Sequence, residues 1–164
     1  MLIVSAVPAQ IGRDWIARHI PHHGAMCLID SVTAWDSDII QCATQTHTHA
    51  DNPLRADGRL GALCGVEYAA QAMAIHCAIL LARQSAIGGT AAAGYIAALR
   101  DVECRVDRLD TYLQPLQIVA SRQAGFAGGA MYDFVIGHAS LTLQTGRVTL
   151  KLAALAADDP GAAS

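Results

Sequence analysis

A single carboxylate, that of Glu67, interrupts the longest apolar segment of this chain, which runs from Leu60 to Ala82. Moving an ionised carboxylate out of water costs several kcal/mol unless the group is paired or hydrogen-bonded. A carboxylate at such a position therefore either changes its pKa or takes part in chemistry. In a helix, Gln71 lies one turn beyond Glu67, on the same face. Upstream, His22 and His23 form a second polar cluster, and an imidazole with a carboxylate is a common acid–base pair.

The segment from Leu60 to Ala82 is long enough to span a bilayer. It nevertheless contains Glu67, Gln71 and His76, and it is rich in alanine and glycine rather than in leucine and isoleucine. Arginines flank both of its ends and set no orientation. A helix that is apolar on all sides is more simply surrounded by protein, so we expect a buried core helix here.

Composition indicates one heavily buried domain over residues 1–156, with a disordered tail at 157–164. The net charge of −3 and the scattered arginines exclude a basic surface for nucleic acid or membrane. Five cysteines without a CxxC pair predict neither a disulfide framework nor a zinc site, and we expect them to be reduced. No signal peptide is evident at the N-terminus, which favours a cytoplasmic protein.

The pattern on either side of the core helix is typical of β-strands. β-Branched residues fill 31–48, and alternating apolar residues follow the helix in four segments: 95–106, 116–122, 131–143 and 147–155. Turns are predicted at 50–61, 110–115, 125–129 and at Thr145-Gly146, with a flexible break at Gly88-Gly89. An antiparallel β-sheet wrapped around one long central helix, an α+β arrangement, fits this order because the helix needs cover on every side.

That layout is the hotdog fold, and two motifs within it are informative. The segment Ile20–Val32, IPHHGAMCLIDSV, resembles the Pro-His-x5-Leu-x-Asp-x-Val signature of 3-hydroxyacyl-acyl carrier protein dehydratases. The segment Gly65–Gln71, GVEYAAQ, resembles the Val-Glu-x-x-x-Gln motif of their central helix, and Asn52-Pro53 falls where that family has an Asn-Pro. Within the superfamily the chain looks closest to dehydratases of aryl polyene or polyketide-like gene clusters.

The resemblance implies a role for each matching residue. His22 corresponds to the catalytic histidine and would remove the C2 proton of the substrate. Glu67 corresponds to the catalytic acid and would protonate the leaving hydroxyl, which requires desolvation to keep it neutral. The family site also implies that the two residues meet across a dimer interface. Gln71 would hold Glu67 in its rotamer, and a backbone N–H among Ala62, Leu63 and Cys64 would stabilise the thioester oxygen.

The sequence departs from the family pattern ahead of the core helix. The family's Gly-His-Phe-Pro-Gly loop is replaced by residues 46–51, THTHAD, and the stretch from Asn52 to Glu67 is longer. We expect both changes at the mouth of the pocket. The longer loop contains Arg55 and Arg59, which are candidates for docking an acidic carrier protein, although solvated loop charges are the simpler interpretation. His47 and His49 would share one face of a strand, but no third metal ligand is spaced to join them.

These observations predict a dehydratase that converts 3-hydroxyacyl-acyl carrier protein thioesters to trans-2-enoyl thioesters, in fatty-acid-like or aryl polyene synthesis, without a metal or organic cofactor. The expected partners are acyl carrier protein and a second hotdog chain, in a homodimer or in a heterodimer with a paralogous dehydratase. Two alternatives remain open: a hotdog acyl thioesterase, in which the carboxylate activates water, and a non-catalytic subunit that shapes the pocket of a paralogue.

Overall fold

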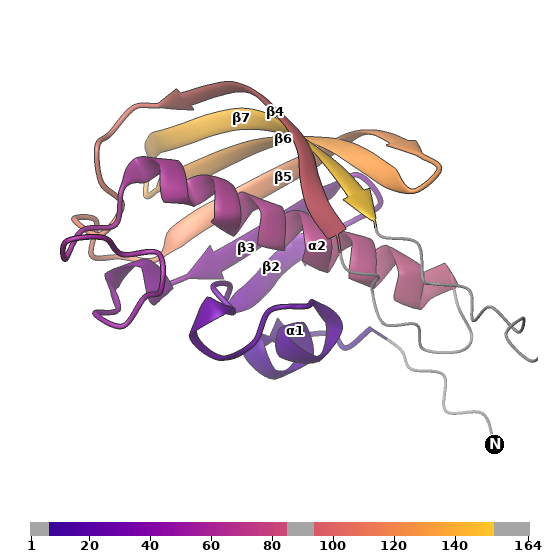
Figure 1. The fold of residues 1–164 in the computed structure, drawn as a ribbon. Helices are drawn as coiled ribbons and strands as arrows, with labels where there is room; N and C mark the ends of the chain where they lie inside the picture. Colours follow the sequence, from indigo (N-terminus) through magenta and orange to yellow (C-terminus); the bar gives the residue numbers. More distant parts are fainter. Residues whose placement is uncertain (1–6, 85–93, 153–164) are drawn as a thin grey trace, which may run out of the picture.

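The computed structural model describes residues 7–84 and 94–152, and these form one antiparallel sheet around a long helix (Figure 1). The sheet order is β1-β2-β3-β5-β6-β7-β4, with every neighbouring pair antiparallel. The strands are β1 (Ile11–Gly12), β2 (Ser31–Trp35), β3 (Ile39–Thr44), β4 (Gly94–Cys104), β5 (Leu116–Phe126), β6 (Gly129–His138) and β7 (Leu141–Leu152). The expected hotdog fold is confirmed.

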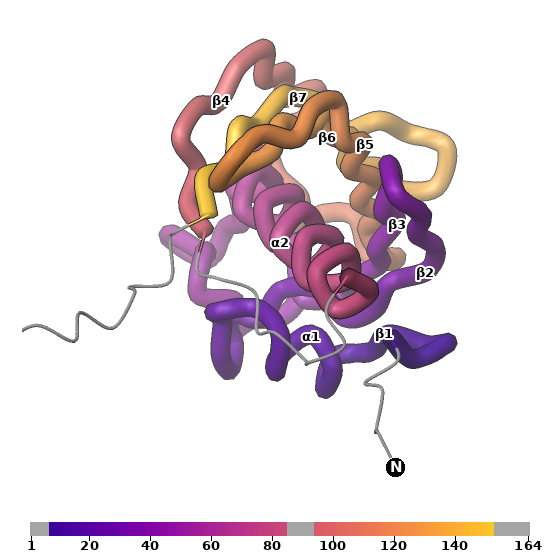
Figure 2. The backbone as a smooth tube through the Cα atoms, turned by 90° about the vertical axis from the view of Figure 1, so that its right-hand side faces the viewer, coloured from indigo at the N-terminus to yellow at the C-terminus, as the bar shows by residue number. Residues whose placement is uncertain are grey.

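The sheet curves around the central helix α2 (Gly65–Gln84), while the short helix α1 (Arg13–His19) packs on the opposite side of α2 (Figure 2). Tyr68, Met73 and Ile75 of α2 are fully buried. The inward residues of β6 meet them, because alternate residues of a strand point to one face. Tyr132, Phe134 and Ile136 are buried in this way, as the alternation predicted.

One face of α2 remains partly open. Glu67, Ala70 and Ala74 are half-buried, Leu81 is also half-buried one to two turns further on, and the exposed Leu63 precedes them in a 3₁₀ turn (Ala62–Cys64). These positions follow one another at intervals of three, four or seven residues, so they form a single stripe along the helix. The segment Ala62–Gln84 has the length and mean hydropathy of a membrane span, yet most of it is buried inside this fold. The expected core helix is therefore confirmed, apart from this stripe.

The predicted turn at Thr145-Gly146 was wrong, because both residues lie in the middle of β7. A β-carbon at Gly146 would overlap the ring of Phe134, so the glycine allows an aromatic side chain to approach the strand closely. The chain instead reverses between β6 and β7 at Ala139, which has a positive φ of 52°. The segment 131–143 is consequently two strands rather than one.

The segment 31–48, which its β-branched residues predict as one long strand or two short ones, forms two strands, β2 and β3. The second strand ends earlier than predicted, at Thr44, and Thr46–Thr48 form a 3₁₀ turn. His47 is fully buried there, and its Nε2–H donates a hydrogen bond to the Tyr112 carbonyl over 2.6 Å. His49 lies beyond the turn. The two histidines do not alternate on a strand. The predicted break at Gly88-Gly89 and the tail at 157–164 lie outside the described residues.

Candidate active site

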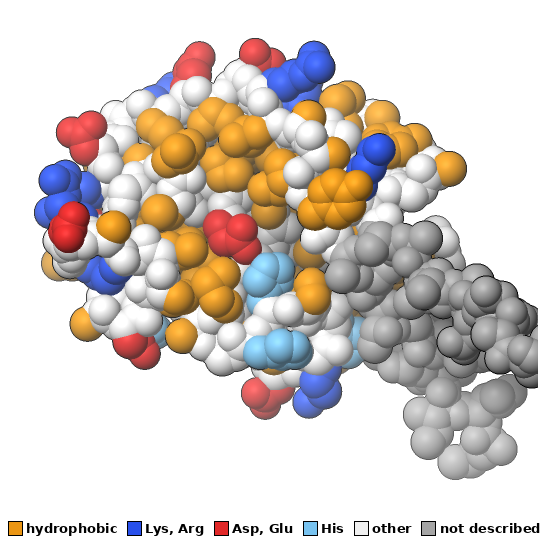
Figure 3. Space-filling model, viewed as in Figure 1, with side chains coloured by type: hydrophobic (Ala, Val, Ile, Leu, Met, Phe, Trp, Pro, Cys, Tyr) orange, Lys and Arg blue, Asp and Glu red, His pale blue; other side chains and the backbone are white. Residues whose placement is uncertain are grey.

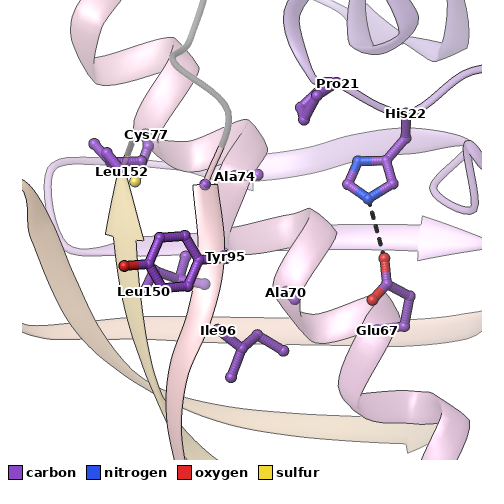
Figure 4. Close-up of a pocket in the computed structure, with 11 residues that line it drawn as sticks. Pro21, His22, Glu67, Ala70, Ala74, Cys77, Tyr95, Ile96, Leu150 and Leu152 are labelled. Atoms are coloured by element: carbon purple, nitrogen blue, oxygen red, sulfur yellow. Dashed lines mark ion pairs between the residues drawn. The ribbon is translucent and has the colours of Figure 1, made fainter. Parts of the chain in front are cut away.

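The two residues singled out as an acid–base pair meet in the structure. Nε2 of His22 lies 3.1 Å from Oε1 of Glu67, and the two side chains face each other across the mouth of a cavity (Figure 4). Both residues belong to the same chain. The expectation that they would meet across a dimer interface is therefore wrong: the loop before β2 folds back over α2 and brings His22 to its own Glu67.

Gln71 fixes this return of the loop. Its side-chain Nε2 donates to the Met26 carbonyl over 2.8 Å and to Oε1 of Glu67 over 3.1 Å, while its Oε1 accepts the Leu28 N–H over 2.9 Å. Gln71 is fully buried, so these bonds replace lost hydration. One amide thus ties the loop that carries His22 to the helix that carries Glu67, in addition to orienting the carboxylate.

The loop itself is short and well anchored. Gly24 has a positive φ of 57°, which favours glycine, and a 3₁₀ turn spans Gly24–Met26. The next residues, Cys27 to Ile29, are buried in the core. His22 therefore stands on a turn that is held on its C-terminal side by packing, while His23 is exposed and points to no partner among the described residues.

The electrostatics of Glu67 differ from expectation. The hydrogen bond from His22 lowers the pKa of the Glu67 carboxyl below its ordinary value, and this effect outweighs the opposing effect of burial. Gln71 lowers the same pKa further. The prediction of a carboxylic acid kept neutral by desolvation was therefore wrong. The lowered pKa favours the ionised form of Glu67, and the group in contact with it is the imidazole of His22.

The helix N-terminus supplies fewer free donors than the sequence suggested. The Ala62 N–H donates to the Asp107 carbonyl over 3.0 Å, and the Cys64 N–H donates to the Gly61 carbonyl over 3.1 Å. Among the described residues, the Leu63 N–H has no such backbone acceptor. Leu63 precedes Glu67 by one helical turn, so this N–H lies on the side of the helix that carries the carboxylate.

The altered loop ahead of α2 contributes to the core more than to the cavity. Asn52 Nδ2 donates to the Thr46 carbonyl over 2.9 Å and to the Tyr68 hydroxyl over 2.8 Å, and Thr46 Oγ1 donates to the Leu28 carbonyl over 2.7 Å. None of residues 46–61 is among the described residues that line the cavity at Glu67. The Asn-Pro motif thus anchors Tyr68, the neighbour of Glu67, a role that the sequence analysis did not identify.

Arg55 and Arg59 occupy different environments. Arg55 lies 3.1 Å from the Asp110 carboxylate and donates to the carbonyls of His47, His49 and Gly58, and its side chain is only 16% exposed. Arg59 is exposed. Arg55 therefore ties the loop together, and only Arg59 is free to meet a partner.

The cavity beside the dyad, here called the dyad cavity, has a volume of about 240 Å³. Ala70, Ala74 and Cys77 line it along α2. The opposite wall consists of Tyr95, Ile96, Leu150 and Leu152, from β4 and β7 (Figure 4). The sequence analysis missed these wall residues. Small residues that follow Glu67 at successive intervals of three, four and three positions, namely Ala70, Ala74 and Cys77, were the signal that could have identified the helix side.

His76, by contrast, is a core residue, as expected. Its Nδ1 lies 2.9 Å from the Tyr132 hydroxyl and its Nε2 lies 2.8 Å from the Asp36 carbonyl. Burial lowers its pKa, so the ring is neutral. His76 therefore has no free nitrogen for a substrate or a metal.

His22 and Glu67 can transfer protons at the edge of the apolar dyad cavity. A carboxylate and an imidazole nitrogen lie within hydrogen-bond distance, and a substrate carbon chain has apolar side chains to contact. Among the described residues that line this cavity, Cys77 and Tyr95 are the only ones besides the dyad with an ionisable side chain. Burial raises the pKa of the Cys77 thiol, which leaves it protonated and unreactive.

Solved structures similar to this fold are hotdog proteins. The dehydratase heterocomplex ApeI:P from Xenorhabdus doucetiae matches with a TM-score of 0.72 at 21% identity, over 84% of this chain and 90% of that one. The PaaI protein of E. coli, from the phenylacetic acid degradation operon, matches with a TM-score of 0.54 at 13% identity, over 85% and 88%. Thioesterase HI1161 of Haemophilus influenzae gives 0.54 at 10% identity, over 78% and 80%. These likenesses establish the fold.

A comparison with curated protein sequences gave no significant match. The comparison with family models was decisive instead. The model described as ApeP-like, ApeP dehydratase, matches residues 15–157, which include most of α1, the dyad and every strand from β2 to β7. The chain therefore belongs to the ApeP dehydratase family.

Proposed function

We propose that this protein dehydrates 3-hydroxyacyl thioesters carried by acyl carrier protein and releases the trans-2-enoyl thioester. The observation that carries the proposal is the His22–Glu67 pair, 3.1 Å apart at the edge of an apolar cavity, in a member of a dehydratase family. The proposed setting is the cytoplasm, in a fatty-acid-like or aryl polyene pathway.

We assign the two roles in the opposite sense to the family analogy, because the lowered pKa of the Glu67 carboxyl favours its ionised form. With the shared proton on His22, the Glu67 carboxylate removes the C2 proton of the substrate. The C2–H electron pair forms the C2–C3 double bond as the C3–O bond breaks, and His22 Nε2–H gives its proton to the departing hydroxyl, which leaves as water. The proton on Glu67 then returns to His22 over the 3.1 Å between them, which restores the starting state.

Charge develops on the thioester oxygen while the C2 proton leaves. A backbone N–H at the start of a helix stabilises such charge, because the peptide dipoles align there. The Leu63 N–H is the donor we propose, since Ala62 and Cys64 already donate to the protein. The thioester would then lie across the first turn of α2, with the acyl chain in the dyad cavity and the carrier protein outside it.

The edge strand β4 is the proposed site for a second hotdog chain. It pairs with β7 on one side only, and it exposes the large hydrophobic side chains of Tyr95, Ile96 and Leu99. Figure 3 shows that hydrophobic side chains gather on the face that carries α2 and β4. An unpaired strand edge with exposed apolar residues is a template for pairing with another chain. The heterocomplex in the similar solved structure favours a heterodimer with a paralogue for this chain.

The proposal is tested by one assay with two readouts. The purified chain is mixed with a 3-hydroxyacyl thioester on acyl carrier protein, and the absorbance of the conjugated enoyl thioester and the release of free thiol are followed together. Enoyl absorbance without thiol release is the expected result. Thiol release without enoyl product would instead establish the thioesterase alternative.

A chain that shapes the pocket of another enzyme gives a third outcome in this assay. Neither signal would then appear with the purified chain, and activity would need a paralogous dehydratase. The comparison must include His22→Ala in the mixed complex. If His22→Ala leaves the activity of that complex unchanged, the dyad of this chain is not catalytic and the proposal is wrong.

A further inference from the structure

A second cavity continues the dyad cavity along α2. This distal cavity has a volume of about 190 Å³, and its lining includes Leu80, Leu81, Gln84 and Arg122. It shares two lining residues with the dyad cavity, Cys77 and Leu152. In Figure 4, Cys77 and Leu152 lie together at the end of the dyad cavity that is away from His22 and Glu67. The two cavities therefore adjoin at these two side chains, which we call the neck.

The spacing of the lining residues shows that the path is straight. Glu67, Ala70, Ala74, Cys77, Leu81 and Gln84 line one cavity or both, at intervals of three and four residues. Such residues lie on a single face of a helix. At 1.5 Å per residue, the neck is about 15 Å from Glu67 along the axis, and Gln84 is about 25 Å from it.

The two walls of the neck differ in the size of their side chains. On the helix side stands Cys77, one of the smaller side chains, buried and 3.6 Å from the Tyr132 hydroxyl. On the sheet side, Leu152 ends β7 and pairs with Gly94 of β4. A β-carbon at Gly94 would contact Leu152 at 3.3 Å, so the leucine already rests against that backbone. The room at the neck thus depends mainly on the side chain at position 77.

We propose that the acyl chain of the substrate passes between Cys77 and Leu152 into the distal cavity, and that Cys77 sets the chain length the enzyme accepts. This inference rests on the proposed function. An extended chain spans about 1.2 Å per chain atom, so about 12 atoms reach the neck from Glu67 and about 20 reach Gln84. Acyl chains longer than about 12 atoms are the substrate class that uses both cavities.

The far end of the path limits this length. Arg122 and the exposed Gln84 line it, and Arg122 has no ion-pair partner among the described residues. A β-carbon at Gly125 would overlap the Arg122 guanidinium, so that group lies against the β5 backbone. An apolar chain gains nothing by displacing water from a guanidinium, and it should end before this point.

The test compares two substrates on one series of variants. Turnover of 3-hydroxyhexanoyl- and 3-hydroxyhexadecanoyl-pantetheine is measured for the unaltered chain, Cys77→Ala, Cys77→Phe and Leu81→Trp. Cys77→Phe should reduce kcat/KM for the long substrate by about tenfold or more and change the short one little, because only the long chain must pass the neck. Leu81→Trp should give the same selectivity, and Cys77→Ala should not. Ala82→Phe, on the same helix but lining neither cavity, is the matched control.

Binding of an unreactive ligand separates this inference from the proposed function. Calorimetry with hexadecanoyl-pantetheine, which lacks the hydroxyl, should show weaker binding to Cys77→Phe than to Ala82→Phe, by about tenfold. If no substrate is dehydrated but this difference holds, the function is wrong and the path stands. If Cys77→Phe affects both chain lengths equally, or binds the long ligand as tightly as the unaltered chain does, the path through the neck is wrong.

Discussion

At the scale of single residues, the lowered pKa of Glu67 is the property that governs the site. A carboxyl in this half-buried position would have a raised pKa from burial alone, and the hydrogen bond from His22 reverses the direction. The sequence showed that the two residue types were present, and the motifs indicated that they meet. It could not show the sign of the shift, because that sign depends on two opposing effects whose balance is set by a 3.1 Å contact.

Removing either member of the dyad should abolish most activity. General acid–base groups contribute about 10²–10⁴-fold, so His22→Ala and Glu67→Gln should each reduce kcat by roughly that factor. His23→Ala should have a small effect, because His23 is exposed and lies beside the dyad without contacting it. Rates are measured by enoyl absorbance, with circular dichroism to show that the variants fold. Near-normal turnover by His22→Ala would contradict the acid–base assignment.

The titration of Glu67 should respond to its neighbour. The side-chain carboxyl, followed by carbon NMR, should titrate below the ordinary glutamate value of about 4.3 and move upward in His22→Ala, where burial acts without the hydrogen bond. A carboxyl with a depressed folded pKa stabilises the protein above its unfolded pKa, and this contribution disappears as the pH falls through the folded pKa. Because the Glu67 pKa is less depressed in His22→Ala, this variant should lose less stability than the unaltered chain as the pH falls below the ordinary glutamate pKa. An unchanged titration would show that the contact is absent in solution.

At the scale of elements, a few buried polar side chains hold the loops on α2. Gln71 ties the loop that carries His22, and Asn52 with Tyr68 ties the loop ahead of the helix. Sequence patterns predicted α2 and most strand positions, because the apolar period differs between helices and strands. They misplaced the last hairpin, because Gly146 lies in a strand beneath Phe134 and local sequence does not reveal that contact. They also placed His47 in a strand, although tertiary burial puts it in a 3₁₀ turn.

Substitution of Gln71 should lower both stability and activity. Gln71→Met keeps the side chain about as long but leaves the Leu28 N–H and the Met26 carbonyl unpaired in the interior. Each unpaired buried group costs about 1–3 kcal/mol, so the free energy of unfolding should fall by about 2–4 kcal/mol in urea titrations. Activity of the folded fraction should fall as well, because His22 loses its fixed position. Full activity in a destabilised Gln71→Met would show that Gln71 does not position the dyad.

Substitutions of the two arginines in the loop ahead of α2 should have different effects, on stability for Arg55 and on binding of the carrier protein for Arg59. Arg55→Ala removes one of two arginine partners of the Asp110 carboxylate, the other being Arg108, together with the bonds from Arg55 to three loop carbonyls. The free energy of unfolding should fall by about 1–2 kcal/mol. Arg59→Glu should leave stability unchanged but raise KM for carrier-bound substrate, with less effect in high salt. A pantetheine substrate, which lacks the carrier, serves as the control. Equal losses with both substrates would exclude Arg59 from carrier docking.

At the scale of the whole molecule, the position of the dyad within one chain determines whether a partner subunit must contribute catalytic residues. Both side chains come from one chain, so a partner on β4 would complete the walls of the site without donating its acid or base. The sequence analysis predicted the sheet, the helix and the residues of the dyad, but it placed the dyad between chains. That error came from the family analogy, since no sequence pattern records which copy of a residue reaches a site.

Mixing inactive variants should consequently fail to restore activity. A mixture of His22→Ala and Glu67→Gln contains no intact dyad in any chain, so enoyl formation should stay at the level of the single variants after subunit exchange. Recovery of a substantial fraction of activity would show that the dyad forms between chains. Light scattering on Leu99→Asp, which places a charge on the exposed β4 edge, should show a loss of the dimer and so verify the exchange interface.

A site whose chemistry comes from one chain changes how a pair of related subunits can diverge after gene duplication. Mutations that remove the histidine or carboxylate of one copy leave the other copy's dyad intact, since neither residue is borrowed. Selection on the inactive subunit then acts on its contacts at the interface and on its effect on the shape of the active subunit's pocket. Because Gln71 holds the loop with His22 on the helix of the same chain, one subunit of a dimer would be able to lose its catalytic residues while the other stays active.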